Sequence, residues 1–302
     1  MAELEISPSY LRRLAEQALL EDGAWQDVTT GALVSREQRG RAFIIAKEAG
    51  VLCGLPMAEA VLRALEPSLL FEPRLTDGAP LLPGQVVAVI EGHLSPILRA
   101  ERTALNFLQR LSGIATATAR LVEAIGDLPC RLRDTRKTTP GLRALERYAV
   151  RVGGGENHRF NLAEGILIKD NHLAALRTRG LEIAEAVRLV RQAAPHPMKV
   201  EVEVTMVTEA HEALAAGADE LLLDNMSPAE MREVAALAHQ QGVPVEASGG
   251  ITLANIREVA ETGVDYISVG AITHSAKALD LSLEVEVGGA WVASSMKLLT
   301  DQ

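Results

Sequence analysis

Six short apolar runs in the second half of the chain each end in a polar residue, and helical segments separate the later ones. The runs span 130–134, 165–169, 200–204, 221–224, 243–248 and 266–270, and the helical segments 181–192, 208–216, 228–240 and 256–262. This alternation predicts right-handed βα units and a parallel sheet. Because near-continuous apolar strands are buried on both faces, we predict an α/β fold with an incomplete parallel barrel of six or seven strands. An open doubly wound sheet is the competing topology.

The first hundred residues predict a smaller α/β domain. Ser7 and Pro8 have the pattern of a helix start, and strand-like runs at 42–46 and 85–90 flank a helical run at 56–65. A second Ser-Pro pair at 95–96 predicts a long helix, interrupted at Gly113 and resuming through Leu121.

A strand near the end of the sequence has a different pattern. Apolar residues alternate strictly with polar ones from Leu279 to Val287, as in a strand with one face in solvent. We predict that this strand leaves the barrel and returns to the sheet of the N-terminal domain. The expected domains are therefore residues 1–112, completed by 279–302, and the barrel, 113–278.

Charge and composition exclude several function classes. The formal net charge of -10 argues against a nucleic-acid or membrane-surface partner, and only 3% of residues are aromatic, too few for stacking on single strands. Cys53 and Cys130 lie far apart with no ligand-type spacing, so neither a disulfide framework nor a zinc site is expected. The start lacks a signal peptide and no apolar segment approaches a membrane span, so we expect a cytoplasmic protein.

Against this acidic background, residues 97–170 carry 13 Lys and Arg against 8 Asp and Glu. The cationic groups gather near predicted strand ends, where barrel enzymes place their working residues. A single such residue is more often an ordinary loop charge, but six consecutive strand ends share the feature. They carry Arg136 with Lys137, Lys169 with Asn171, Glu203, Asp224 with Asn225, Ser248 with Gly249 and Gly250, and Gly270.

Particular chemistries follow from these residue types. Gly153 to Gly155 precede His158 and Arg159, which could turn inward toward a carboxylate. The glycine turns at 248–250 and 268–270 favour phosphate binding as a pair, although each alone is equally well explained as a tight turn. Glu203 and Asp224 end neighbouring strands and could share a divalent cation or hold ribose hydroxyls. Lys169 is also compatible with a Schiff-base aldolase, a second choice because of the surplus of arginine.

Nine ordered blocks of sequence resemble the quinolinate phosphoribosyltransferase family nearly end to end. They are EDGAWQDVTT at 21, ERTALNFLQRLSGIAT at 101, DTRKTTPGLR at 134, GGGENHRFNL at 153, LIKDNH at 167, VEVEV at 200, LLLDN at 221, EASGGI at 246 and SVGAITHS at 268. One departure is Gln26, where the family usually has glycine before the aspartate. Because it lies far from the barrel motifs, it casts little doubt on activity.

The resemblance implies an N-terminal α/β sandwich, an incomplete barrel, and a homodimer in which Arg102 reaches the active site of the partner. The implied reaction transfers phosphoribosyl from phosphoribosyl pyrophosphate to quinolinate with loss of CO2, giving nicotinate mononucleotide. Arg102, Arg136, His158, Arg159 and Lys169 would bind the quinolinate carboxylates. The donor and its Mg²⁺ would be held by Lys137, Glu203, Asp224, Ser248, Gly249, Gly250, Ser268, Val269 and Gly270, and Thr135 would be a further substrate-binding residue. The catalytic residues would be Lys137, Lys169, Glu203 and Asp224, and the metal ligands Glu203 and Asp224.

Several alternatives stay open from sequence. Glu201 is the fallback for Glu203 in the VEVEV block. A relative acting on nicotinate, or one linked to molybdenum uptake, is the nearest rival, although three arginines suit a di-acid better than a mono-acid. The Lys169 aldolase and a non-catalytic phosphometabolite-binding protein are rivals from other classes.

Overall fold

The computed structural model describes residues 6–195, 197–287 and 290–291, which form two compact units. The first unit comprises the chain up to Ala117, residues 144–153, and the described residues from Ala276 onward. The second comprises Thr118–Arg143 and Gly154–Ser275. Of the segment 279–302 that was predicted to complete the N-terminal domain, residues 288–289 and 292–302 lie outside the described residues.

The first unit is built on a five-stranded sheet in the order β13-β12-β1-β5-β3. Its strands are β1 (Arg39–Ala46), β3 (Leu70–Pro73), β5 (Val86–His93), β12 (Leu281–Val287) and β13 (Ala290–Trp291), and β2 (Gly50–Val51) pairs with β4 (Pro80–Leu81). Its helical segments are α1 (Pro8–Glu21), η1 (Ala24–Gln26), α2 (Val28–Leu33), α3 (Leu55–Leu65), most of α5 (Arg143–Val152) and the first part of α4 (Leu94–Ile125).

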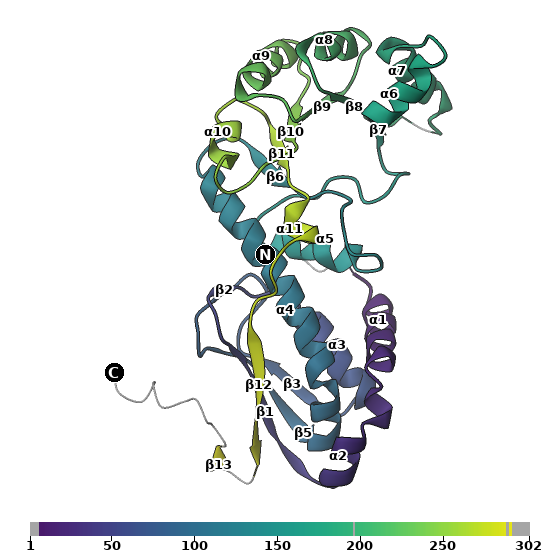
Figure 1. Cartoon of the computed structure of the whole chain (residues 1–302). Helices are drawn as coiled ribbons and strands as arrows, with labels where there is room; N and C mark the ends of the chain where they lie inside the picture. The colour runs from purple at the N-terminus through teal and green to yellow at the C-terminus, as the bar shows by residue number, and fades with distance from the viewer. Residues whose placement is uncertain (1–5, 196, 288–289, 292–302) are drawn as a thin grey trace. The chain divides into compact units, whose positions relative to one another are not determined.

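Strand β12 lies antiparallel to β1, with Leu283 opposite Ile44 (Figure 1). This confirms the prediction that the alternating segment near the end of the sequence joins the N-terminal sheet. Alternation suits this place because one face of an antiparallel sheet can meet solvent while the other covers a core.

Helix α4 runs through Gly113 without a break, so the predicted interruption is wrong. A Cβ at Gly113 would lie 3.0 Å from the Lys277 carbonyl carbon and 3.1 Å from the Ala278 Cα. The glycine is therefore explained by the close approach of the segment leading to β12. Intrahelical hydrogen bonds tolerate one glycine, at a cost of roughly 1 kcal/mol relative to alanine.

The second unit contains a six-stranded parallel sheet in the order β6-β11-β10-β9-β8-β7. Its strands are β6 (Arg131–Arg133), β7 (Ile166–Ile168), β8 (Val200–Val204), β9 (Glu220–Asp224), β10 (Val245–Ser248) and β11 (Tyr266–Ser268). Its helices are α6 (Asp170–Arg177), α7 (Ile183–Ala193), α8 (Val207–Ala215), α9 (Pro228–His239), α10 (Ile256–Ala260) and α11 (Ala271–His274). Each predicted strand of this sheet and each predicted barrel helix is present; β8 has the predicted ends, and each of the other predicted elements is shifted at one end or both.

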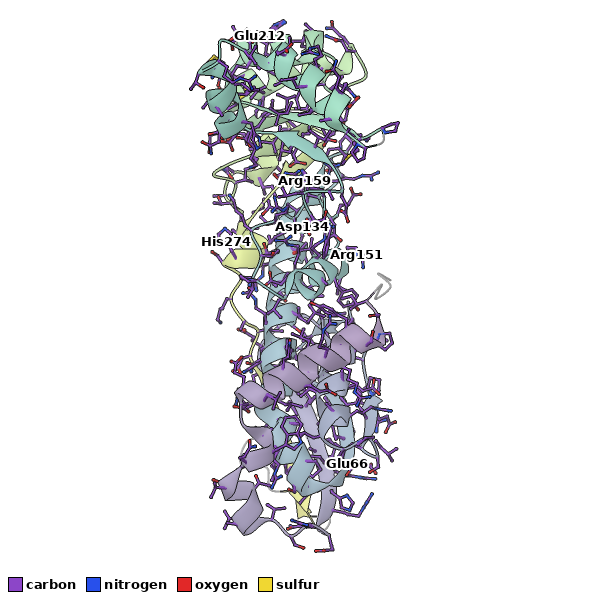
Figure 2. All side chains as sticks on the ribbon, turned by 90° about the vertical axis from the view of Figure 1, so that its right-hand side faces the viewer. Glu66, Asp134, Arg151, Arg159, Glu212 and His274 are labelled. Carbon is purple, nitrogen blue, oxygen red and sulfur yellow. The ribbon has the colours of Figure 1, made fainter. Side chains whose placement is uncertain are left out.

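The strand order is that of a barrel left open between its first and second strands. Helices α8, α9 and α10 lie on the outer side of the strands (Figure 1), and Glu212 on α8 projects outward into solvent (Figure 2). Among the described pairings, β6 and β7 are not hydrogen-bonded to each other. Instead, Glu156 makes a parallel bridge to Arg133, so the segment after Gly155 runs along the free edge of β6. The incomplete barrel predicted from sequence is confirmed.

No helix in the described part of the chain is long and apolar enough to cross a membrane.

Candidate active site

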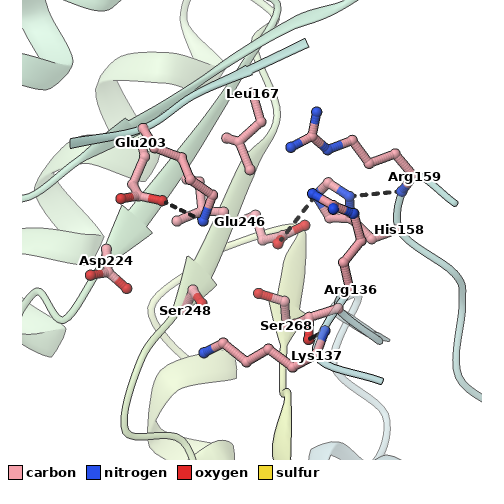
Figure 3. A pocket seen from close by; sticks show the side chains of 13 residues that line it. Arg136, Lys137, His158, Arg159, Leu167, Glu203, Asp224, Glu246, Ser248 and Ser268 are labelled. Carbon is pink, nitrogen blue, oxygen red and sulfur yellow. Dashed lines mark hydrogen bonds and ion pairs between the residues drawn. The ribbon is translucent and has the colours of Figure 1, made fainter. Parts of the chain in front are cut away.

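A pocket of about 430 Å³ opens at the carboxyl ends of the six parallel strands. Figure 3 shows Glu203 and Asp224 on one side of it and Arg136, His158 and Arg159 on the other. Thirteen residues line it: Thr135, Arg136, Lys137, His158, Arg159, Leu167, Lys169, Glu203, Leu222, Asp224, Glu246, Ser248 and Ser268.

The loop after β6 is folded back by short local hydrogen bonds. The backbone N–H of Lys137 donates to Thr135 Oγ1 at 3.1 Å, and that of Thr138 donates to the Arg136 carbonyl at 2.9 Å. From α11, Thr273 Oγ1 donates to the Lys137 carbonyl at 2.7 Å. These contacts fix the backbone beneath Arg136 and Lys137, which limits the entropy that the two cations lose on binding an anion.

Asp134 links this loop to the segment that carries His158. Its side chain is fully buried, and it accepts the backbone N–H of His158 at 2.8 Å and the Asn157 side-chain amide at 2.7 Å. Figure 2 shows Asp134 and Arg159 in the same region of the second unit. A buried carboxylate that receives two such donors holds the neighbouring segment in register with β6.

Arg143 ties the same two loops from the other side. Its Nε donates to Thr138 Oγ1 and its Nη1 to the Phe160 carbonyl, both at 3.0 Å. The guanidinium of Arg159 is fixed by a hydrogen bond, in which Nη1 donates to the Gly165 carbonyl at 2.7 Å. The cationic side of the pocket is thus fixed by contacts among Asp134, Arg143 and the backbone.

The acidic side is formed by β8 and β9. Glu203 Oε2 lies 3.3 Å from Lys169 Nζ, and Oε1 accepts the Asp170 backbone N–H at 3.4 Å. Asp224 accepts from the Asn225 side chain at 2.8 Å. Since Glu203 pairs in register with Leu222, Asp224 lies one same-face position further along the neighbouring strand.

The structure distinguishes the two glutamates that sequence left open. Glu201 and Glu203 are two residues apart on β8 and therefore share a face. Glu203 lines the pocket, whereas Glu201 is 6% exposed and lies one position deeper, with Oε2 3.1 Å from His158 Nε2.

Two glycines are required by close approach and backbone conformation. Gly249 has φ +90°, and a Cβ there would collide with the Asn225 side chain. Gly270 has an ordinary φ, but a Cβ would lie 2.8 Å from Lys137 Cδ and 3.3 Å from Thr135 Oγ1. Glycine at these turns lets the end of β10 approach Asn225 after β9, and the end of β11 approach Lys137 and Thr135 in the loop after β6.

Burial and neighbouring charges shift the pKa of several groups. Burial, assisted by the charge of Arg136, lowers the pKa of Arg159, although a guanidinium stays charged throughout the physiological range. Burial also opposes a charge on His158, but its hydrogen bond to Glu201 and the charge of Glu246 outweigh burial and raise its pKa. For Glu246, burial and then the charge of Glu201 raise the pKa, against the opposing effects of His158 and Arg133.

Most of the residues predicted from sequence meet in this pocket. Five of the predicted residues are not among those that line it: Arg102, Gly249, Gly250, Val269 and Gly270. Arg102 lies exposed on α4 within the first unit, and Val269 is buried. The sequence analysis missed Leu167, Leu222 and Glu246. Glu246 could have been found from its position two residues before Ser248, which places both on one face of β10.

The matches to known families cover nearly the whole chain. The model described as quinolinate phosphoribosyl transferase, C-terminal domain, matches residues 114–284, and the corresponding N-terminal domain model matches residues 27–112. The chain belongs to the quinolinate phosphoribosyltransferase family. The family, fold and enzyme class predicted from sequence are therefore confirmed.

Curated relatives in this family match the chain over most of its length. The nicotinate-nucleotide pyrophosphorylase (carboxylating) of Homo sapiens is 41% identical, with 93% of this chain and 94% of the relative covered. The enzyme of the same name from Mycobacterium leprae is 40% identical, with 91% and 96% covered. A solved nicotinate-nucleotide pyrophosphorylase from Francisella tularensis is 39% identical, with a TM-score of 0.86 and coverage of 94% and 98%.

A human nicotinic acid phosphoribosyltransferase is 16% identical with a TM-score of 0.59, covering 96% of this chain and 76% of that one. At this identity the likeness shows a shared fold alone. The fold therefore does not separate an enzyme that acts on quinolinate from one that acts on nicotinic acid, and the residues of the site must do so.

Proposed function

We propose that the protein transfers the phosphoribosyl group of phosphoribosyl pyrophosphate to quinolinate, with decarboxylation, and releases nicotinate mononucleotide, pyrophosphate and CO2. The observation that carries this proposal is that the pocket of this chain has two chemically distinct sides. One side offers cationic groups for a planar di-acid, and the other offers carboxylates for a ribose and its phosphates.

The acceptor side consists of Arg136, His158, Arg159 and Lys169. Arg136 Nε is buried and has no hydrogen-bond partner among the described residues, so a donor there is available to a ligand. Guanidinium groups match carboxylates bidentately, and the two carboxylates of quinolinate lie on adjacent ring atoms. Arg102 would join from the partner of a homodimer, which its exposed position on α4 permits.

The donor side consists of Lys137, Thr135 and the turns after β10 and β11. Backbone N–H groups at Gly249, Gly250 and Gly270 suit phosphate oxygens, whereas the Val269 N–H already donates to the Arg133 carbonyl at 3.1 Å. Barrel enzymes commonly bind phosphate at the ends of their last two strands, and β10 and β11 are the last two here. Lys137 would pair with the leaving pyrophosphate as a point charge.

The residues present fit a magnesium ion that arrives with the donor. Glu203 and Asp224 supply hard carboxylate oxygens from adjacent strands, and Mg²⁺ is usually held by one or two carboxylates together with substrate phosphates. When bound, the ion would neutralise charge that develops on pyrophosphate.

The chemistry needs positioning more than acid–base catalysis. As pyrophosphate leaves C1 of the ribose, positive charge develops on the sugar, and the carboxylates of Glu203 and Asp224 would stabilise it. Arg136 and Arg159 would hold the ring nitrogen of quinolinate close to C1. Once ribosylated, this nitrogen is a pyridinium. Its positive charge stabilises the electron pair left on the adjacent ring carbon when the carboxylate departs as CO2, and a proton from solvent then takes the place of the carboxylate.

The alternative of a Schiff-base lysine is disfavoured by the surroundings of Lys169. Its ammonium pairs with Glu203 and its side chain is 47% exposed. Schiff-base lysines act as neutral amines in desolvated pockets or beside other cations.

The test is an assay of the purified protein with quinolinate, phosphoribosyl pyrophosphate and Mg²⁺. We expect nicotinate mononucleotide and CO2 in equal amounts, and no mononucleotide when the donor is omitted. Binding of both substrates without release of pyrophosphate would instead support the non-catalytic alternative.

A further inference from the structure

A layer of buried ionisable side chains lies below the pocket, inside the barrel. Barrel interiors are usually filled by branched apolar residues. Here the interior contains Glu201 at 6% exposure, Glu220 at 7% and Glu246 at 0%, together with Arg133 and His158. Arg133 Nη1 donates to Glu246 at 2.8 Å and also to Glu220. Such a layer is costly to bury, so each member needs a defined partner.

Both ring nitrogens of His158 are engaged by protein groups. Nδ1 accepts the backbone N–H of Arg159 at 2.7 Å, as Figure 3 shows. Nε2 lies 3.1 Å from Glu201 Oε2 and 3.8 Å from Glu246 Oε1. Because a nitrogen that accepts an N–H carries no proton, the geometry describes the neutral ring with its proton on Nε2, donated to Glu201.

This tautomer determines what His158 can do. Despite burial, the two carboxylates beside Nε2 raise the pKa of His158 and so favour the imidazolium at low pH. A proton on Nδ1 would confront the N–H of Arg159, so the contact in this structure belongs to the neutral ring. The ring therefore acts as a bridge, in which Glu201 orients His158 and His158 receives the Arg159 amide. From the opposite side, Asp134 accepts the His158 backbone N–H at 2.8 Å. The backbone N–H groups of both His158 and Arg159 are thus held by hydrogen bonds, which fixes the backbone from which the Arg159 side chain extends.

The metal-ligand-type side chains around the ring already have protein partners. His158, Glu201 and Glu246 offer ligand-type atoms within 4.8 Å of one another. Glu246 shares the guanidinium of Arg133 with Glu220, and Glu201 accepts the Nε2 proton of His158. A divalent cation would have to displace that proton and lie close to a guanidinium, which costs electrostatic energy.

We propose that Glu201 is a positioning residue, which fixes the Nε2–H tautomer of His158 and thereby the backbone of Arg159 on the acceptor side of the pocket. The inference rests on the proposed function for the role of Arg159, but not for the tautomer itself. It assigns the two glutamates of β8 different tasks: Glu203 faces the substrates, and Glu201 supports the residue that binds one of them.

Three variants separate positioning from a structural role. Glu201→Leu removes the acceptor for Nε2–H, whereas Glu201→Gln keeps an acceptor oxygen and loses only the charge. Glu220→Gln is the matched control, because Glu220 belongs to the same buried layer and pairs with Arg133 but has no described contact with His158. We expect Glu201→Leu to raise the KM for quinolinate at least about tenfold, since an orphaned buried donor reorients its ring. The KM for phosphoribosyl pyrophosphate should stay within about twofold.

We expect the KM of Glu201→Gln for quinolinate to lie within about threefold of the wild-type value. Glu220→Gln should lower thermal stability and leave the KM for quinolinate unchanged. Equal effects of Glu201→Leu on both substrates, or a Glu201→Gln variant as impaired as Glu201→Leu, would overturn the proposal. So would a Glu220→Gln variant with the same quinolinate defect, or a stoichiometric metal in the purified protein.

A spectroscopic measurement tests the tautomer of His158 in the wild-type protein, so it depends neither on enzyme activity nor on whether Glu201→Leu folds. In ¹⁵N-histidine spectra of the wild-type protein at pH 8, with His158 assigned by its absence in His158→Asn, we expect one pyridine-type Nδ1 and one protonated Nε2. An Nδ1–H tautomer or an imidazolium at that pH contradicts the inference. If the protein made no mononucleotide while this signal was present, the proposed function would fail and the tautomer would stand.

Discussion

Lys169 and Glu203, which end the adjacent strands β7 and β8, form an ion pair with 3.3 Å between Nζ and Oε2. Glu203 is nearly buried in this pair, whereas Lys169 is half-exposed. The contact joins the cationic and acidic sides of the pocket. We infer that a dicarboxylate bound to Lys169 would compete with Glu203 and would free the Glu203 carboxylate to face the sugar.

The first prediction concerns Glu203. Glu203→Gln keeps the shape of the side chain and removes its charge, so we expect kcat to fall roughly 10- to 100-fold through lost stabilisation of the cationic sugar. Steady-state kinetics with both substrates measure this, and Glu212→Gln on the exposed face of α8 is the control. An unchanged kcat would remove Glu203 from the catalytic residues.

The second prediction concerns Arg136. Arg136→Ala removes a donor whose Nε is buried and unpaired among the described residues. We expect the KM for quinolinate to rise about 10- to 100-fold, as for a lost charge-assisted hydrogen bond, with a smaller effect on the donor. Arg63→Ala, on the surface of α3, should match the wild type. Wild-type turnover with unchanged quinolinate affinity in Arg136→Ala would contradict the assignment.

The third prediction compares two glycines with similar backbone angles. Gly249 has φ +90° and would collide with Asn225 if it carried a Cβ, whereas Gly242 has φ +69° and nothing within 4 Å. We expect Gly249→Ala to raise the KM for phosphoribosyl pyrophosphate at least about tenfold by moving the turn after β10. Gly242→Ala should cost about 1 kcal/mol of stability and leave the kinetics alone. Similar kinetics for the two variants would argue against a phosphate-binding turn.

The fourth prediction concerns the thiols. Burial raises the pKa of Cys130 to about 12, and burial also raises the pKa of Cys53. Since the thiolate is the reactive form, about one Cys130 in ten thousand would be ionised at pH 8. We expect labelling by a thiol reagent to be far slower than for the unfolded chain and to quicken as pH rises. Rapid labelling of the native protein would show that burial is incomplete.

Much of the fold could be predicted because the strands have unambiguous patterns. Buried parallel strands are short apolar runs, and β12 was distinguished from them by its strict alternation. Gly113 was misjudged because a glycine in a helical pattern can mark a break or a close approach, and only the position of Lys277 decides between them.

The candidate site was predictable where chemistry lies at strand ends, and not where it lies beneath them. Period-two alternation places Glu201 and Glu203 on the same face, so no local pattern shows which one reaches the pocket. Glu246 and Arg133 lie within apolar runs, and their pairing depends on the strand order of the six-stranded sheet. That order is a property of the tertiary structure.

The central claim is that the cationic side of the pocket selects a dicarboxylate. The most direct measurement is the ratio of kcat/KM for quinolinate to that for nicotinate, determined with the same protein and saturating phosphoribosyl pyrophosphate. Because nicotinate leaves one set of buried cationic donors unpaired, we predict a ratio of at least roughly 100 in favour of quinolinate. A ratio near one, or a preference for nicotinate, would contradict the account.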